Sequence, residues 1–118
     1  MTQLDDALRG LKAHEGVEHV LLVGTDGLLV RHMGDSGGPD PERVAAMLPG
    51  VLTASSSLAR SAGGGRSSTV VVEMEDGVAI AASVSTELLL AVLVRSGVGF
   101  GALLRSLRRE RGRVADLV

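Results

Sequence analysis

The sequence predicts a single α+β domain whose elements follow the order helix, strand, strand, helix, strand, strand, strand, helix. Its 118 residues suffice for one hydrophobic core and are too few for two independent ones. Hydrophobic residues make up 45% of the chain and charged residues 22%, a balance typical of a globular fold. Segments with helical periodicity are interspersed with short apolar runs bounded by glycine-containing turns, which favours helices packed on a sheet.

Composition also narrows the classes of function. Aromatic residues account for only 1% of the chain, Phe100 being the single one, so a nucleic-acid surface of stacked aromatic rings is excluded. The formal net charge of −2 provides no overall attraction to nucleic acid or anionic lipid. The chain has no cysteine, and its longest apolar run, Leu88–Val94, is too short for membrane insertion. The acidic N-terminus lacks the pattern of a signal peptide, so we expect a cytoplasmic protein without disulfides or cofactors.

The first part of the chain predicts a helix followed by a β-hairpin. Apolar residues recur at helical spacing over Leu4–Leu11, and Thr2 is a suitable N-cap for this helix. The runs Val17–Val23 and Leu28–Met33 flank the turn signal Thr25-Asp26-Gly27. Alternation along the first strand places Val20 and Leu22 on one face and Val17, Leu21 and Val23 on the other. Because both faces are apolar, we expect this strand inside the sheet, covered on both sides.

The middle of the chain predicts a long helix after a glycine-rich loop. Asp40 and Pro41 are the residue types preferred at the N-cap and at the first helical position. We expect the helix to kink at Pro49, which has no backbone N–H, and to end at Gly63-Gly64-Gly65. Small side chains are frequent along it, which lets another helix or sheet approach closely. Its expected apolar stripe comprises Val44, Met47, Leu48, Val51, Ser55, Leu58 and Ala62.

The remaining chain predicts three strands and a final helix. Strands are expected over Ser67–Glu75, Val78–Val84 and Glu87–Val94, with the tight turn Asp76-Gly77 between the first two. The helix is expected from about Val98 to Val114. We interpret its arginines as a solvated face near the helix C-terminus, or else as a site for an acidic protein partner. These arginines are Arg105, Arg108, Arg109, Arg111 and Arg113. Elsewhere in the chain, we interpret three methionines as core residues: Met33, Met47 and Met74.

Three stretches carry a family resemblance: VEHVLLVGTDGL over Val17–Leu28, MEDGV over Met74–Val78, and LLLAVLV over Leu88–Val94, followed by glycine and a helix. They resemble the Roadblock (dynein light chain) family, and the resemblance extends from about Leu4 to Leu107. It implies a profilin-like α/β/α sandwich with a five-stranded antiparallel sheet, the middle helix on one face and the terminal helices on the other. A single domain over residues 1–118 follows, with a core at about 4–107 and a basic helical extension to about 114.

The resemblance also implies a function. Family members form dimers through the middle helix and the strand after it, and bacterial members are associated with small Ras-like GTPases. We therefore expect a non-catalytic homodimer that binds a Ras-like GTPase and modulates its nucleotide cycle or localisation, alongside signalling proteins of the same operon. A pure assembly scaffold with no effect on GTP turnover is the alternative. The expected dimer interface comprises Val51, Ser55, Leu58, Ala59, Ala62, Thr69, Val70, Val71, Val72 and Glu73, and the candidate partner contacts are Arg43, Arg60 and Arg66.

Two loops and the histidines suggest other chemistry. The segment Gly34–Pro39 matches the surroundings of the nucleophilic serine in chymotrypsin-like proteases, so a serine hydrolase using Ser36 is a further alternative. A turn-forming connector is favoured, because that family places its histidine and aspartate well upstream on a larger scaffold. The segment Gly63–Ser68 looks like a phosphate loop, but it follows a helix and lacks the lysine, which favours a helix end. The histidines lack metal-ligand spacing, although His19 and His32 are expected to be cross-strand neighbours.

Overall fold

The computed structural model describes residues 2–118 and confirms the predicted order of elements. The elements are α1 (Gln3–Lys12), β1 (Val17–Gly24), β2 (Leu29–Gly34), α2 (Pro41–Ser61), β3 (Thr69–Met74), β4 (Gly77–Ser83), β5 (Leu88–Arg95) and α3 (Gly101–Leu117). Both predicted N-caps are present, because the side chains of Thr2 and Asp40 accept hydrogen bonds from backbone N–H groups in the first turns of α1 and α2. The last helix begins three residues later than predicted, after a turn in which Gly97 has a φ of 83°.

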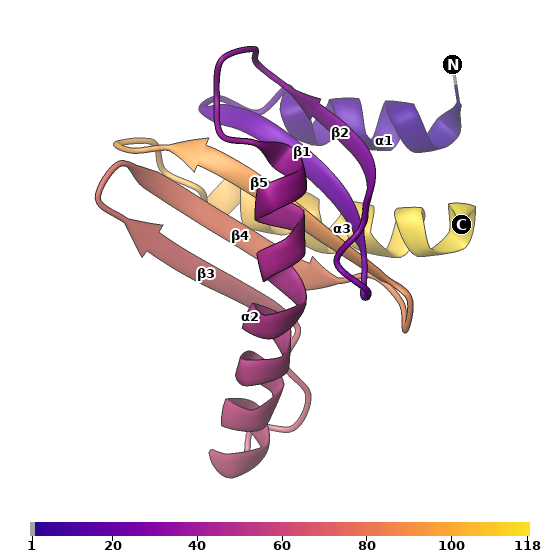
Figure 1. The fold of residues 1–118 in the computed structure, drawn as a ribbon, viewed down its shortest axis with the longest axis vertical. Helices are drawn as coiled ribbons and strands as arrows, with labels where there is room; N and C mark the ends of the chain where they lie inside the picture. The colour runs from indigo at the N-terminus through magenta and orange to yellow at the C-terminus, as the bar shows by residue number, and fades with distance from the viewer. Residues whose placement is uncertain (1) are drawn as a thin grey trace.

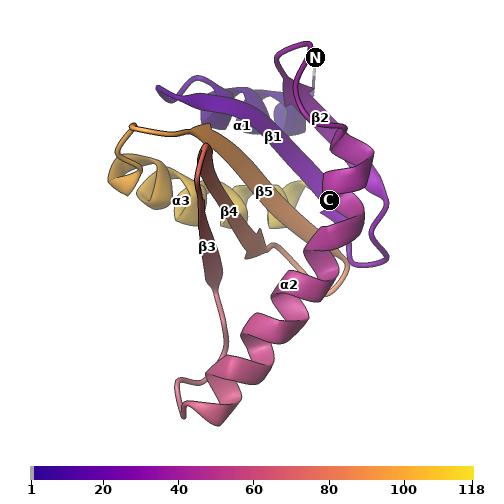
Figure 2. The ribbon, with the colours of Figure 1, turned by 60° about the vertical axis from the view of Figure 1, so that its left-hand side comes forward.

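The five strands form one antiparallel sheet in the order β2-β1-β5-β4-β3. The helix α2 crosses one face of this sheet, and α1 and α3 lie together on the other face (Figures 1 and 2). The molecule is therefore the predicted α/β/α sandwich. β1 is an interior strand, as its two apolar faces predicted, and β3 lies at an edge.

Two hydrophobic clusters fill the spaces between the layers. The cluster against α1 and α3 contains Val17, Val20 and Leu22 of β1, and the cluster against α2 contains Leu21 and Val23. The prediction that Val17 shares a face with Leu21 and Val23 is therefore wrong. The register of β1 against β5 shifts between Val17 and His19, and this bulge reverses the alternation at the start of the strand.

The apolar stripe predicted for α2 is also wrong in part. The residues that α2 buries are Ala45, Leu48 and Leu52, whereas Met47 and Leu58 are 68% and 69% exposed. All three buried residues lie in the first twelve positions of the helix, and its second half extends past the sheet (Figure 1). Met47 is accordingly not a core residue. Neither α2 nor any other helix in the described part of the chain is long and apolar enough to cross a membrane.

Candidate interaction surface

The edge strand β3 is incompletely covered. It pairs with β4 on one side, and its other side has no strand partner among the described elements. Val71, Val72 and Met74 are 39%, 40% and 50% exposed, so apolar side chains reach solvent on both faces of the strand. An edge strand with free backbone N–H and C=O groups and exposed apolar side chains is a template for pairing with another chain.

The second half of α2 adds apolar surface on the same side of the molecule. Leu58 is exposed and Val51, seven residues before it on the same helix face, is half-buried. The hydroxyl of Ser55 on this flank hydrogen-bonds to the hydroxyl of Ser67, in the segment that leads into β3. This contact directs the flank toward β3. We call the combined region the edge surface; it comprises Val51, Ser55 and Leu58 of α2 with Val71, Val72 and Met74 of β3.

The residues predicted for the dimer interface divide into two groups. Val70 is half-buried because it packs against the core cluster under α2, and Thr69 is half-buried at the start of β3, so their own chain already occupies much of their surface. The exposed members are Leu58, Ala62, Val71, Val72 and Glu73, and the other half-buried members are Val51, Ser55 and Ala59. Met74 was misinterpreted as a core residue. Its even spacing from Val72 placed it on the correct face, but only the position of β3 at the sheet edge leaves it exposed.

The structure separates the three arginines predicted to contact a partner. Arg43 lies exposed in the first turn of α2, at the opposite end of the helix from Arg60. Arg60 and Arg66 line one open groove at the end of the sheet where β3 begins, and Arg111 of α3 lines it as well. Sequence reasoning did not group Arg111 with the other two, because only the packing of α3 behind the sheet brings it to this place.

His19 and His32 are neighbours, as predicted. His19 is 5% exposed, and its Nδ1 lies 3.0 Å from Nε2 of His32, within hydrogen-bonding distance. Burial lowers the pKa of His32 below its ordinary value of 6.5, and the adjacent His19 lowers it further. The loop after β2 packs against His19, since a Cβ added at Gly38 would lie 2.5 Å from Nε2 of His19. Ser36 is exposed in that loop, while the two histidines bond to each other.

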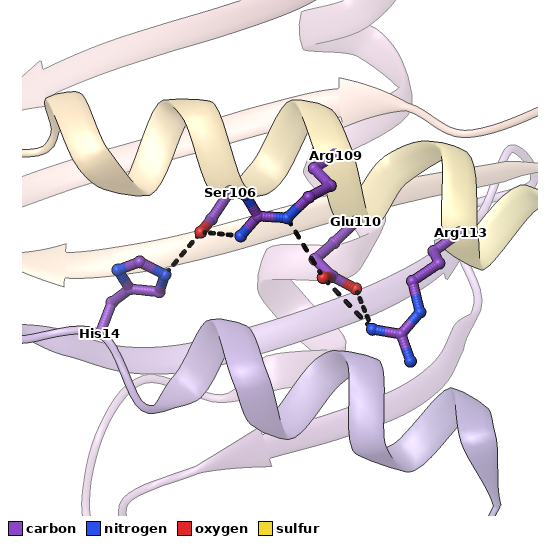
Figure 3. Close-up of polar contacts among 5 residues, drawn as sticks. All are labelled: His14, Ser106, Arg109, Glu110 and Arg113. Carbon is purple, nitrogen blue, oxygen red and sulfur yellow. Dashed lines mark hydrogen bonds and ion pairs between the residues drawn. The ribbon is translucent and has the colours of Figure 1, made fainter.

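The basic helix α3 contains an acidic residue that the sequence analysis did not single out (Figure 3). Glu110 is only 9% exposed; Nη1 of Arg113 lies 3.1 Å from its Oε2, and Nε of Arg109 lies 3.9 Å from its Oε1. Ser106 accepts a hydrogen bond of 3.0 Å from Arg109 and lies 2.8 Å from Nε2 of His14. These contacts connect α3 to the turn after α1, so this part of the helix has a structural role.

Comparison with known proteins assigns the fold to a family. The model of the Roadblock/LC7 domain matches residues 3–94 of this chain. No protein with a curated functional description matches it. Among solved structures, MglB of Myxococcus xanthus has a TM-score of 0.86 at 17% identity, with 99% of this chain and 95% of that chain covered.

Two further structures have the same fold. A Roadblock/LC7 domain from Streptomyces avermitilis has a TM-score of 0.84 at 24% identity, with 98% of each chain covered. MglC of Myxococcus xanthus has a TM-score of 0.70 at 20% identity, with 99% of this chain and 100% of that chain covered. Since the family model covers most of the sequence and the structures agree over nearly its whole length, this chain belongs to the Roadblock/LC7 family.

Proposed function

We propose that this protein is a non-catalytic cytoplasmic homodimer that binds a small Ras-like GTPase and modulates its nucleotide cycle or localisation. The observation that carries the proposal is the edge surface, in which an unpaired strand lies beside an exposed apolar helix flank. Two copies that pair their β3 strands would satisfy the free backbone groups and cover the flanks of both α2 helices. A long-lived dimer of this kind needs to bury on the order of 1,000 Å² in total.

Family membership supports the GTPase as partner, because bacterial Roadblock proteins resemble this chain and are associated with Ras-like GTPases. The dimer would present two copies of α2 as one platform that is complementary to the nucleotide-sensitive switch region. Preferential binding to one nucleotide state shifts the population toward that state by the difference in affinity. Stimulation of hydrolysis would require either repositioning of the groups in the GTPase itself or an arginine from this chain.

The test is a GTPase assay with a Ras-like GTPase from the same organism, loaded with GTP or GDP. We expect the homodimer to bind one nucleotide state more tightly and to change the rate of phosphate release. If an arginine is supplied in trans, one of the variants Arg43→Ala, Arg60→Ala and Arg66→Ala loses stimulation but keeps binding. Equal affinity for both states and an unchanged hydrolysis rate would instead identify the alternative, an assembly scaffold. Absence of binding in either state would refute the proposal.

A further inference from the structure

A groove lies at the end of the sheet where β3 begins and β4 ends. It has a volume of about 1050 Å³ and is formed by the last turns of α2, the connector to β3, the turn between β4 and β5, and α3. A second hollow of about 420 Å³ continues it along α2 past Pro49 and Leu52, and the two share Ser56 and Arg60. Segments that are distant in sequence therefore form one long and open depression that α2 lines on one side.

The lining of this groove is basic and rich in hydroxyl groups. Arg60, Arg66 and Arg111 contribute three guanidinium groups from three different segments of the chain. Six further lining residues are serine or threonine, so hydrogen-bond donors surround the arginines. No aspartate or glutamate is among the residues that line it. The groove thus combines several positive charges with neutral donors and contains no internal counter-charge.

No carboxylate in the described part of the chain neutralises the three arginines of the groove. Arg60 donates a hydrogen bond of 3.4 Å to the hydroxyl of Ser57, and Arg111 donates one of 3.0 Å to the backbone carbonyl of Ser68. Within residues 2–118, neither of them nor Arg66 forms an ion pair with a carboxylate. Elsewhere on α3, by contrast, two arginines pair with a buried carboxylate. The contact with the Ser68 carbonyl also fixes the guanidinium group of Arg111 at the entrance to β3.

The groove and the edge surface lie on different flanks of α2. Leu58 and Arg60 are two residues apart, which places their side chains about 200° apart around a helix. Thr53, Ser56 and Arg60 share the groove flank at helical spacing. On α2, the residues that line the groove therefore lie on the flank opposite to Leu58.

We propose that this groove is a binding site for phosphate groups. A guanidinium group donates two parallel hydrogen bonds to a phosphate, and a phosphate dianion needs more than one positive charge for neutralisation. Three arginines from three segments supply that charge, and the adjacent hydroxyl groups supply the remaining donors. The connector that resembles a phosphate loop in sequence contributes here through its arginine and serines, and not through a helix N-terminus. The phosphate could come from a free nucleotide or from a phosphorylated side chain of a partner, and neither source requires GTPase binding.

Amide-resolved NMR of the full chain tests this site. The titrants are pyrophosphate, GDP and a phosphoserine peptide, each at a constant ionic strength that is set with sodium chloride. We expect saturable shifts of the amides at residues 63–68 and 83–86, which belong to the groove. Tighter binding of GDP than of pyrophosphate would identify a nucleotide as the source, and tighter binding of the phosphopeptide would identify a phosphorylated partner. Equal binding of the same peptide with aspartate in place of phosphoserine would overturn the phosphate assignment.

Variants that each remove one arginine charge, inside or outside the groove, distinguish a specific phosphate site from non-specific attraction of phosphate to surface arginines. Arg60→Gln, Arg66→Gln and Arg111→Gln should each weaken pyrophosphate binding about tenfold, since each removes one charged hydrogen-bond donor. Arg105→Gln removes the same charge from an exposed position of α3 outside the groove and should leave the affinity unchanged. The proposal would be overturned if Arg105→Gln weakened pyrophosphate binding as much as the groove variants do. It would also be overturned if the amide chemical-shift changes were spread over all surface arginines.

Discussion

At the scale of single residues, the polar groups that matter most are those that the fold covers. Glu110 lies on a helix dominated by arginine, and its burial between α3 and the rest of the domain makes its two ion pairs structural. His32 stands beside a buried histidine, so its neutral form is the one that the folded state favours. Each of these environments has a measurable consequence for stability.

The substitution Glu110→Gln should destabilise the protein by about 1 kcal/mol, because it removes the charge from a carboxylate that two arginines contact. Equilibrium unfolding in urea measures the loss. The matched control is Glu87→Gln, because Glu87 is exposed in the turn before β5. If the two variants lose the same stability, the ion pairs of Glu110 contribute nothing specific.

The lowered pKa of His32 predicts a dependence of stability on pH. The unfolded chain, in which the pKa is near 6.5, binds more protons than the folded chain over the interval between the two pKa values. Stability is therefore full above about pH 6.5 and decreases as the pH falls through that interval. Unfolding free energies measured at about pH 7.5 and about pH 5.5 should differ less for His32→Gln than for the unaltered protein. Identical differences would show that His32 does not cause the effect.

At the scale of elements, α2 has two apolar flanks with different roles. Ala45, Leu48 and Leu52 bind the helix to its own sheet, and the exposed flank that contains Leu58 is available to a second chain. Both flanks consist of small or aliphatic residues at helical spacing, so sequence periodicity predicts a single apolar stripe. The two flanks are distinguished only by their exposure in the folded chain, where one is buried and the other reaches solvent.

The substitution Leu58→Asp should dissociate the proposed dimer while each protomer stays folded, because Leu58 is 69% exposed and the new charge would be buried at the proposed interface. Sedimentation velocity measures the dimer, and circular dichroism measures the fold. The control is Leu28→Asp, since Leu28 is also 69% exposed but lies in the β1–β2 turn. Leu48→Asp, at a buried position, should unfold the chain. If the Leu58→Asp variant still forms a dimer, Leu58 does not belong to the dimer interface.

At the scale of the whole molecule, the sequence predicted the order of elements, both hairpins and the interior position of β1, since these features depend on local patterns. The turn between β3 and β4 lies one residue earlier than predicted, at Glu75-Asp76, because Met74 pairs with Gly77. It failed where a local pattern was overridden or incomplete. A bulge moved Val17 to the other face, and the position of β3 at the edge exposed Met74. The meeting of Arg60, Arg66 and Arg111 depends on three segments packed together, and no spacing in the chain encodes that.

In the proposed dimer, the projecting half of α2 links the stability of one chain to the presence of another. The last residue that α2 buries is Leu52, and the second half of the helix extends past the sheet (Figure 1). A helical segment of that length is marginal in water on its own. Amide hydrogen–deuterium exchange in this segment should therefore slow as the protein concentration rises, while the segment up to Leu52 exchanges slowly at every concentration. Exchange that is independent of concentration would contradict this coupling. In the proposed dimer, association would therefore slow the opening of the end of α2, and the platform offered to a partner would be more ordered than in the isolated chain.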